Sequence, residues 1–260
     1  MNAYHSFIAR LSVLILLSFL WLAEAGAHIV VNGTRVIYPA QKREVLVNIQ
    51  NPDATPSLVQ VWIDSGDTGL SPKQSHVPFI VTPPLFRLDT GKGQTLRLVY
   101  TKEPLPSDRE SLFWLNILDI PPRESVKSDA PVNQLEFAFK HRLKLLFRPI
   151  GLKGTAANAP STITWTLVTT AGGKFALKAT NDSPFHVNFN NVEIINGDAR
   201  YLTESEMVPP FSNRIFNIPK LKAVPQSRLT IQFTYINDYG GASTGTGAIS
   251  QENGTQSAPR

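Results

Sequence analysis

The side chains best suited to catalysis or metal binding are few in this chain and form no known motif. The 260 residues contain no cysteine, which excludes a thiol nucleophile, an iron–sulfur cluster, a cysteine zinc site and a disulfide framework. No H-x-x-x-H or H-E-x-x-H spacing of a zinc site joins the histidines, which are His5, His28, His76, His141 and His186. A G-x-S-x-G nucleophile elbow is also missing. We therefore predict no catalytic residue, no metal and no cofactor, and a protein that binds instead of catalysing.

Three weaker patterns have ordinary structural explanations. Gly91-Lys92-Gly93 faintly resembles a phosphate loop, but the earlier glycine of that motif is missing, so we expect a hairpin turn. Asp108 and Glu110 could form an acid–base pair, yet Arg109 between them favours a structural ion pair. The net charge is +5, but lysines and arginines are dispersed, so no nucleic-acid partner is predicted.

One stretch, 134–145, combines large apolar and basic side chains at strand spacing. Alternation puts Leu135, Phe137 and Phe139 on one face. The opposite face carries a polar and basic series, Glu136, Lys140, Arg142 and Lys144. Two interpretations remain open: an ordinary sandwich strand with its large residues in the core, or an edge strand that presents them to a partner strand.

Period-2 alternation recurs along most of the chain, which predicts short strands separated by polar turns. The expected strands are 45–49, 59–63, 95–100, 112–118, 135–147, 163–168, 175–179, 185–195 and 229–236. This spacing is typical of immunoglobulin-like β-sandwiches, so we predict an all-β fold. A Pro- and Gly-rich segment near Arg148 to Gly154 divides two such domains, 28–150 and 151–241. The tail 242–260 is rich in Ser, Thr, Gly and Gln, and we expect it to be disordered.

The first 27 residues are typical of a secretory signal peptide. Arg10 precedes an apolar run from Leu11 to Leu22, and small residues follow it. Cleavage after Ala25 or after Ala27 is possible, and we favour a mature chain that begins at His28. No later apolar run is long enough to span a bilayer, so we expect an exported protein without membrane insertion.

The mature chain resembles the periplasmic chaperones that assemble pili by the chaperone–usher route. The resemblance covers nearly all of residues 28–241 and rests on seven short segments in order. They are TRVIYP at 34–39, FIVTPP at 79–84, DRESLFW at 108–114, IPP at 120–122, LKLLFRP at 143–149, VPP at 208–210 and INDYGG at 236–241. The resemblance implies two immunoglobulin-like domains in an L-shaped arrangement. The partners it implies are pilin subunits and an outer-membrane usher, and it leaves open self-association of the free protein.

The resemblance also assigns roles to particular residues. Two basic residues in the cleft, which bind the subunit's C-terminal carboxylate, match Arg35 and Lys144. The donor-strand positions, which complete a pilin that lacks its own last strand, match Leu135, Phe137 and Phe139; this pairing is a known example of β-augmentation. A charged trio that fixes the angle between the domains matches Glu110, Arg148 and Asp238.

The segment from Pro121 to Asn133 is short, which together with the absence of cysteine resembles the short-loop subgroup. The chain departs from the family at Gly241, at Leu146 and in its longer polar tail, none of which is a binding position. An exported immunoglobulin-like surface adhesin or a structural pilus component remains the alternative. A pilin usually carries a cysteine pair and an N-terminal donor segment, and this chain offers neither.

Overall fold

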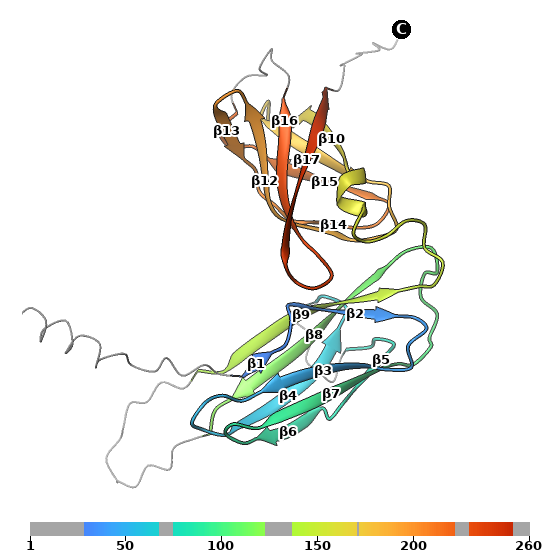
Figure 1. The fold of residues 1–260 in the computed structure, drawn as a ribbon, viewed down its shortest axis with the longest axis vertical. Helices are drawn as coiled ribbons and strands as arrows, with labels where there is room; N and C mark the ends of the chain where they lie inside the picture. The colour runs from blue at the N-terminus through green and yellow to red at the C-terminus, as the bar shows by residue number, and fades with distance from the viewer. Residues whose placement is uncertain (1–28, 68–74, 123–136, 171, 222–228, 252–260) are drawn as a thin grey trace, which may run out of the picture.

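The computed structural model describes residues 29–67, 75–122, 137–170, 172–221 and 229–251. They form two β-sandwiches placed one above the other, with their strands at a steep angle to each other (Figure 1). The all-β prediction is confirmed. The predicted signal peptide and most of the predicted short loop lie outside the described residues.

The described part of the first sandwich has nine strands in two sheets. The strands are β1 Val30–Val31, β2 Arg35–Pro39, β3 Val45–Gln50, β4 Ser57–Asp64, β5 Phe79–Thr82, β6 Leu85–Leu88, β7 Gly93–Tyr100, β8 Ser111–Ile120 and β9 Phe139–Arg148. One sheet has the order β1-β3-β7-β5 and the other β2-β9-β8-β4-β6. The chain changes sheets between β1 and β2, which lets β2 run parallel to β9.

The second sandwich follows a short 3-10 helix, η2 (Ala159–Thr162). Its strands are β10 Thr164–Thr169, β11 Phe175–Asn181, β12 Val187–Asn196, β13 Ala199–Leu202, β14 Met207–Val208, β15 Ser212–Asn217, β16 Thr230–Ile236 and β17 Ala242–Gln251. They are hydrogen-bonded in the order β13-β12-β16-β17-β10-β11-β15, and β14 pairs with β12.

The expected disorder of the tail is wrong for residues 242–251, which form β17. This strand pairs with β16 on one side and with β10 on the other. Composition suggested disorder because the segment has almost no large apolar side chain of its own. The apolar surface beneath it comes from neighbouring strands: a Cβ on Gly245 would lie 2.5 Å from the Phe233 ring, and one on Gly247 2.8 Å from Trp165. Residues 252–260 lie outside the described residues.

Each sandwich has its own hydrophobic core, as the alternating pattern predicts. In the first, Tyr38 is fully buried, and its ring meets Phe79 at 5.4 Å between centroids. In the second, Trp165 is 2% exposed and packs against Phe189 and Phe233. Each sandwich is therefore packed around a core of its own.

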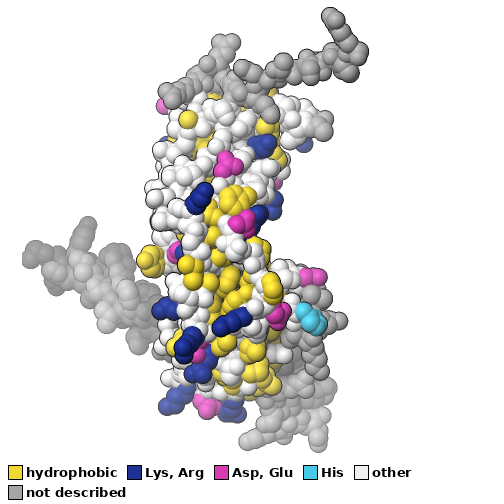
Figure 2. Space-filling model, turned by 90° about the vertical axis from the view of Figure 1, so that its right-hand side faces the viewer, with side chains coloured by type: hydrophobic (Ala, Val, Ile, Leu, Met, Phe, Trp, Pro, Cys, Tyr) yellow, Lys and Arg dark blue, Asp and Glu magenta, His cyan; other side chains and the backbone are white. Residues whose placement is uncertain are grey.

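The surface also has apolar areas. Figure 2 shows hydrophobic side chains gathered along the middle of the lower sandwich, with Lys and Arg side chains beside them. Within the described part of the chain, no helix has the length and apolar character needed to cross a membrane.

Candidate functional site

Two cations of the first sandwich lie side by side at its junction with the second. Arg35 opens β2 and Lys144 lies in β9, and the parallel pairing of these strands makes the two residues direct register partners. Both side chains are only partly exposed. The fold therefore places together two positive charges that are 109 residues apart (144 minus 35) in sequence.

Within the described residues, no carboxylate neutralises either cation. Arg35 donates from Nη1 to the backbone oxygen of Ile236 at 3.0 Å, and Lys144 donates from Nζ to Asn188 Oδ1 at 2.7 Å. Both acceptors are neutral and belong to the second sandwich. Among the described residues, no Asp or Glu oxygen lies within ion-pair distance of either side chain, and Arg35 Nε is buried without a partner.

Both cations of the pair have a lowered pKa. Burial lowers the pKa of Arg35, although Asp238 and Glu110 act in the opposite direction. Burial also lowers the pKa of Lys144, and the neighbouring Arg35 charge lowers it further. A lowered pKa means that the charged form lacks stabilisation, which an anion would supply. The arrangement is suited to binding a carboxylate through charge-assisted hydrogen bonds.

A cavity of about 280 Å³ lies beside Arg35, between the sandwiches. The first sandwich contributes Arg35 and Leu146 to its lining. The second contributes residues of β12, β16 and the turn after β16, including Asn188 and Tyr235. Arg35 and Asn188, the residue that accepts from Lys144, therefore both line an interdomain cleft with room for part of a ligand.

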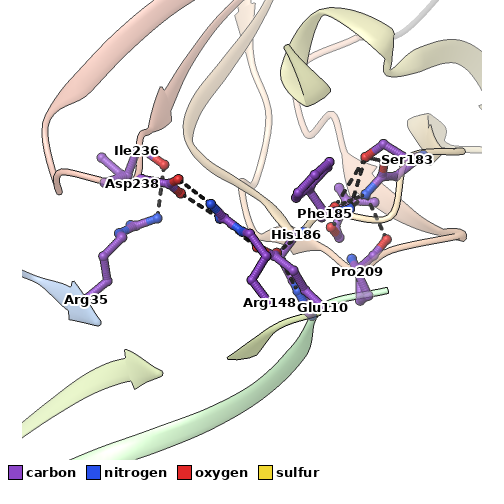
Figure 3. A network of polar contacts seen from close by, with 11 residues as sticks. Arg35, Glu110, Arg148, Ser183, Phe185, His186, Pro209, Ile236 and Asp238 are labelled. Atoms are coloured by element: carbon purple, nitrogen blue, oxygen red, sulfur yellow. Dashed lines mark hydrogen bonds and ion pairs between the residues drawn. The ribbon is translucent and has the colours of Figure 1, made fainter. Parts of the chain in front are cut away.

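A second polar network joins the two sandwiches (Figure 3). Arg148 donates to Glu110 Oε1 at 2.7 Å and, through two nitrogens, to both oxygens of Asp238 at 2.7 and 3.0 Å. Glu110 Oε2 accepts from the backbone nitrogen of His186 at 2.8 Å. The pKa of Arg148 is raised: burial acts to lower it, but the bonds and charges of Asp238 and Glu110 outweigh burial. The structure thus brings together the charged trio that the resemblance named.

The predicted donor residues lie at the start of β9. Leu135 falls outside the described residues, Phe137 just precedes the strand, and Phe139 is its first residue. Phe137 is 60% exposed and Phe139 is 42% exposed. Leu143, Leu145 and Phe147 of the same alternation are buried in the core. The end of this strand therefore places its large residues in the core, whereas its beginning exposes them as an edge strand would.

The edge of β9 is only partly covered. β2 pairs with Lys144–Arg148, and within the described part of the chain no strand pairs with residues 140–143 on that side. An uncovered edge carries unpaired backbone groups that can bind an added strand. The exposed phenylalanines therefore lie at an edge that is open to pairing.

The basic face of β9 lies against tryptophans of β8, its neighbour, and of β4, the next strand in the sheet. Lys140 Nζ lies 4.9 Å from the ring centre of Trp62, and Arg142 lies 4.4 Å from that of Trp114. Arg142 also forms a 3.0 Å ion pair with the buried Asp64. Sequence reasoning missed Asp64, which alternates with core residues of β4 and carries no local signal of this pairing.

The other polar candidates have structural roles. Asp108 pairs with Arg109 at 2.8 Å, while Glu110 turns inward to Arg148. Gly91 lies in a tight turn, with φ of 68° and its nitrogen bonded to the Asn51 oxygen at 2.7 Å. This turn joins β6, which pairs with β4, to β7, which pairs with β3 and β5, so the predicted hairpin is wrong: the chain turns here but crosses between the two sheets. The predicted structural ion pair is confirmed, because Asp108 pairs with Arg109 and Glu110 pairs with Arg148.

The fold and the site define a two-domain immunoglobulin-like protein with two adjacent cations at the junction of its domains. Residues 28–153 match the model of the pili and flagellar-assembly chaperone, PapD N-terminal domain, and residues 158–247 match that of the pili assembly chaperone PapD, C-terminal domain. The chain belongs to this family of pilus-assembly chaperones.

Individual relatives agree with the family match. The probable fimbrial chaperone YadV of Escherichia coli strain K12 is 39% identical over 224 residues, which cover 86% of this chain and 90% of YadV. The crystal structure of the YadV chaperone has a TM-score of 0.73 at 37% identity, covering 85% of this chain and 100% of that chain. The Salmonella enterica SafB chaperone in complex with the SafA pilin gives a TM-score of 0.69 at 32% identity, covering 87% of this chain and 98% of that chain.

Proposed function

We propose that this chain is a periplasmic chaperone that binds pilin subunits, prevents their aggregation and delivers them to an outer-membrane usher. The observation that carries the proposal is the Arg35–Lys144 pair, two adjacent, partly buried cations held by neutral oxygens. The signal-peptide pattern at the start of the sequence supports export to the periplasm. SafB, a structural relative, is described in complex with a pilin.

The cation pair binds the C-terminal carboxylate of the subunit. A guanidinium and an ammonium both donate charge-assisted hydrogen bonds, which are stronger than neutral ones. Because the cleft is partly buried, a carboxylate there is less screened by water than at the surface. Loss of one partner of such a desolvated contact costs about 2–5 kcal/mol of binding free energy.

The start of β9 donates a strand to the subunit. Phe137 and Phe139 enter the groove of a pilin that lacks its last strand, and Leu135 continues the same alternation. The uncovered edge at 140–143 supplies backbone hydrogen bonds. Each large apolar side chain that becomes buried contributes about 1.5–3 kcal/mol. When no subunit is present, the same edge offers a route to self-association.

The trio Glu110, Arg148 and Asp238 fixes the angle between the domains, so that the donor strand and the cleft engage one subunit together. The short connection before β9 supports assignment to the short-loop subgroup. The family match favours a chaperone over a surface adhesin or a structural pilus component.

Co-expression with a pilin subunit in a bacterial periplasm tests the proposal. Wild type should keep the subunit soluble and co-purify with it. The double variant Phe137→Glu, Phe139→Glu and the single variant Arg35→Ala should each fold but lose the subunit. Arg87→Ala, which removes an exposed cation, is the matched control.

Thermal unfolding of each free variant separates binding from folding. If the double variant unfolds when free, these phenylalanines belong to the core and the donor-strand assignment fails. If the subunit co-purifies undiminished with both variants, the proposed binding mode is wrong.

A further inference from the structure

The contacts of Lys144 point to an additional residue of the carboxylate site, contributed by the second domain. Lys144 Nζ donates to Asn188 Oδ1 at 2.7 Å, across the junction between the sandwiches. Asn188 lies in β12 between Val187 and Phe189, which are 1% and 4% exposed. Strand alternation therefore directs the Asn188 side chain away from its own core and toward the cleft.

The chemistry of this contact fixes the orientation of the amide. A lysine ammonium only donates hydrogen bonds, so the oxygen of Asn188 must face it. The Nδ2 group is then directed elsewhere, and it donates to no described residue. Asn188 also lines the cavity beside Arg35. The Asn188 side chain thus accepts from Lys144 through Oδ1, and its Nδ2 group remains available to donate to a ligand in the cavity.

The neutrality of Asn188 matters as much as its position. Arg148, at the same junction, is paired with two carboxylates, which neutralise its charge. Lys144 is held by an amide, which orients the ammonium without cancelling its charge. An ammonium has three donors, so the bond to Asn188 leaves two for a carboxylate.

We propose that Asn188 is a positioning residue of the carboxylate anchor, which holds Lys144 from the second domain and selects a free C-terminal carboxylate. This inference rests on the proposed function of the Arg35–Lys144 pair. It adds that the anchor is completed only when the second domain is in place, because its holding groups, Asn188 and the Ile236 carbonyl, belong to that domain.

The test compares two forms of one probe, a pilin subunit that co-purifies with the wild-type chain, made with a free C-terminal carboxylate and with a C-terminal amide. The measured quantity is the ratio of the two dissociation constants, amide over carboxylate. Asn188→Asp would pair with Lys144 and repel the ligand, so this ratio should fall about tenfold or more. Asn188→Ala should lower it less, and Asn188→Ser, which restores a neutral acceptor, should recover part of it.

The control variant is Asn213→Asp, which makes the same charge change at an exposed position of β15. It should leave the ratio unchanged, and thermal unfolding should show every variant folded. A merely structural role for Asn188 would weaken both probe forms equally and leave the ratio unchanged, which would overturn the inference. Should Asn188→Asp fail to fold, the same ratio is measured for Asn188→Ala and Asn188→Ser, and an unchanged ratio in Asn188→Ala would overturn the inference.

The same data separate this inference from the proposed function. A wild-type ratio near one would overturn both the anchor and the role of Asn188. A high wild-type ratio that persists in Asn188→Asp and Asn188→Ala would overturn only the role of Asn188, and the anchor would stand.

Discussion

At the scale of single residues, Arg148, Arg35 and Lys144 at the junction differ in what surrounds them. Arg148 is neutralised by Glu110 and Asp238. Arg35 and Lys144 bind neutral oxygens and keep their charge available. Because a buried charge without a counter-ion is costly, this difference separates a structural cation from the two for which we propose an anionic ligand.

The lowered pKa of Lys144 predicts a pH dependence of subunit binding. A bound carboxylate favours the protonated ammonium, so binding raises the pKa of Lys144 from its lowered value in the free protein. Affinity should therefore be full below the pKa of the free protein and fall as the pH rises through it. Isothermal titration calorimetry with a pilin subunit at several pH values, from neutral to alkaline, measures this fall.

Lys144→Arg is the matched variant for this prediction, because arginine stays protonated across the same range. Its affinity should be insensitive to pH where that of wild type declines. An equal decline in both proteins would assign the effect to another group, and a flat wild-type profile would contradict the prediction.

At the scale of elements, β17 shows how a strand poor in apolar residues is held in the middle of a sheet. Both of its edges are paired, and its glycines leave room for rings from β16 and β10. The backbone supplies the hydrogen bonds and the neighbours supply the buried surface. A glycine in a strand often marks such a close approach.

Gly245→Ala should therefore destabilise the second sandwich, because the new Cβ would lie 2.5 Å from the Phe233 ring. Overpacking of this kind costs about 1–3 kcal/mol of the free energy of unfolding. Thr246→Ala, at the next and exposed position, should change stability by no more than about 0.5 kcal/mol. Chemical denaturation followed by tryptophan fluorescence measures both. Equal stability of the two variants would contradict the packing of β17.

At the scale of the whole molecule, the two sandwiches meet through polar contacts centred on Glu110, which is 3% exposed. Its two oxygens bind Arg148 on the same sandwich and His186 on the other. Removal of one member of a buried charged network leaves the others uncompensated. The junction should therefore respond more to the loss of Arg148 than to the loss of the partly exposed Asp238.

Arg148→Ala should lower the free energy of unfolding by about 3–5 kcal/mol, since it leaves Glu110 buried without its cation. Asp238→Asn should cost less, because Glu110 still pairs with Arg148 and the amide oxygen can still accept one hydrogen bond. It should reduce the yield of stable protein more than the affinity of the folded protein for a subunit. Urea denaturation and titration with a pilin subunit check the two effects separately. Normal stability with selective loss of binding would contradict the structural role.

The sequence by itself determined the longer alternating strands and the two-sandwich class, but not the remaining strands, among them β2 and β17. Alternation is a local property: residues such as Val47, Ile49 and Leu96 are buried because every second side chain of a strand points to the core. The resemblance supplied Arg35, Lys144 and the charged trio, since their motifs are contiguous in the chain.

Only the tertiary structure decided which distant residues meet and which edges stay open. The parallel register of Arg35 with Lys144, the bond from Lys144 to Asn188 and the pairing of β17 all join segments with no shared local pattern. Composition predicted disorder for β17 because it counts a segment's own side chains, whereas burial there depends on Phe233 and Trp165 from other strands. Strand register and domain contact are set by long-range packing, which local periodicity does not encode.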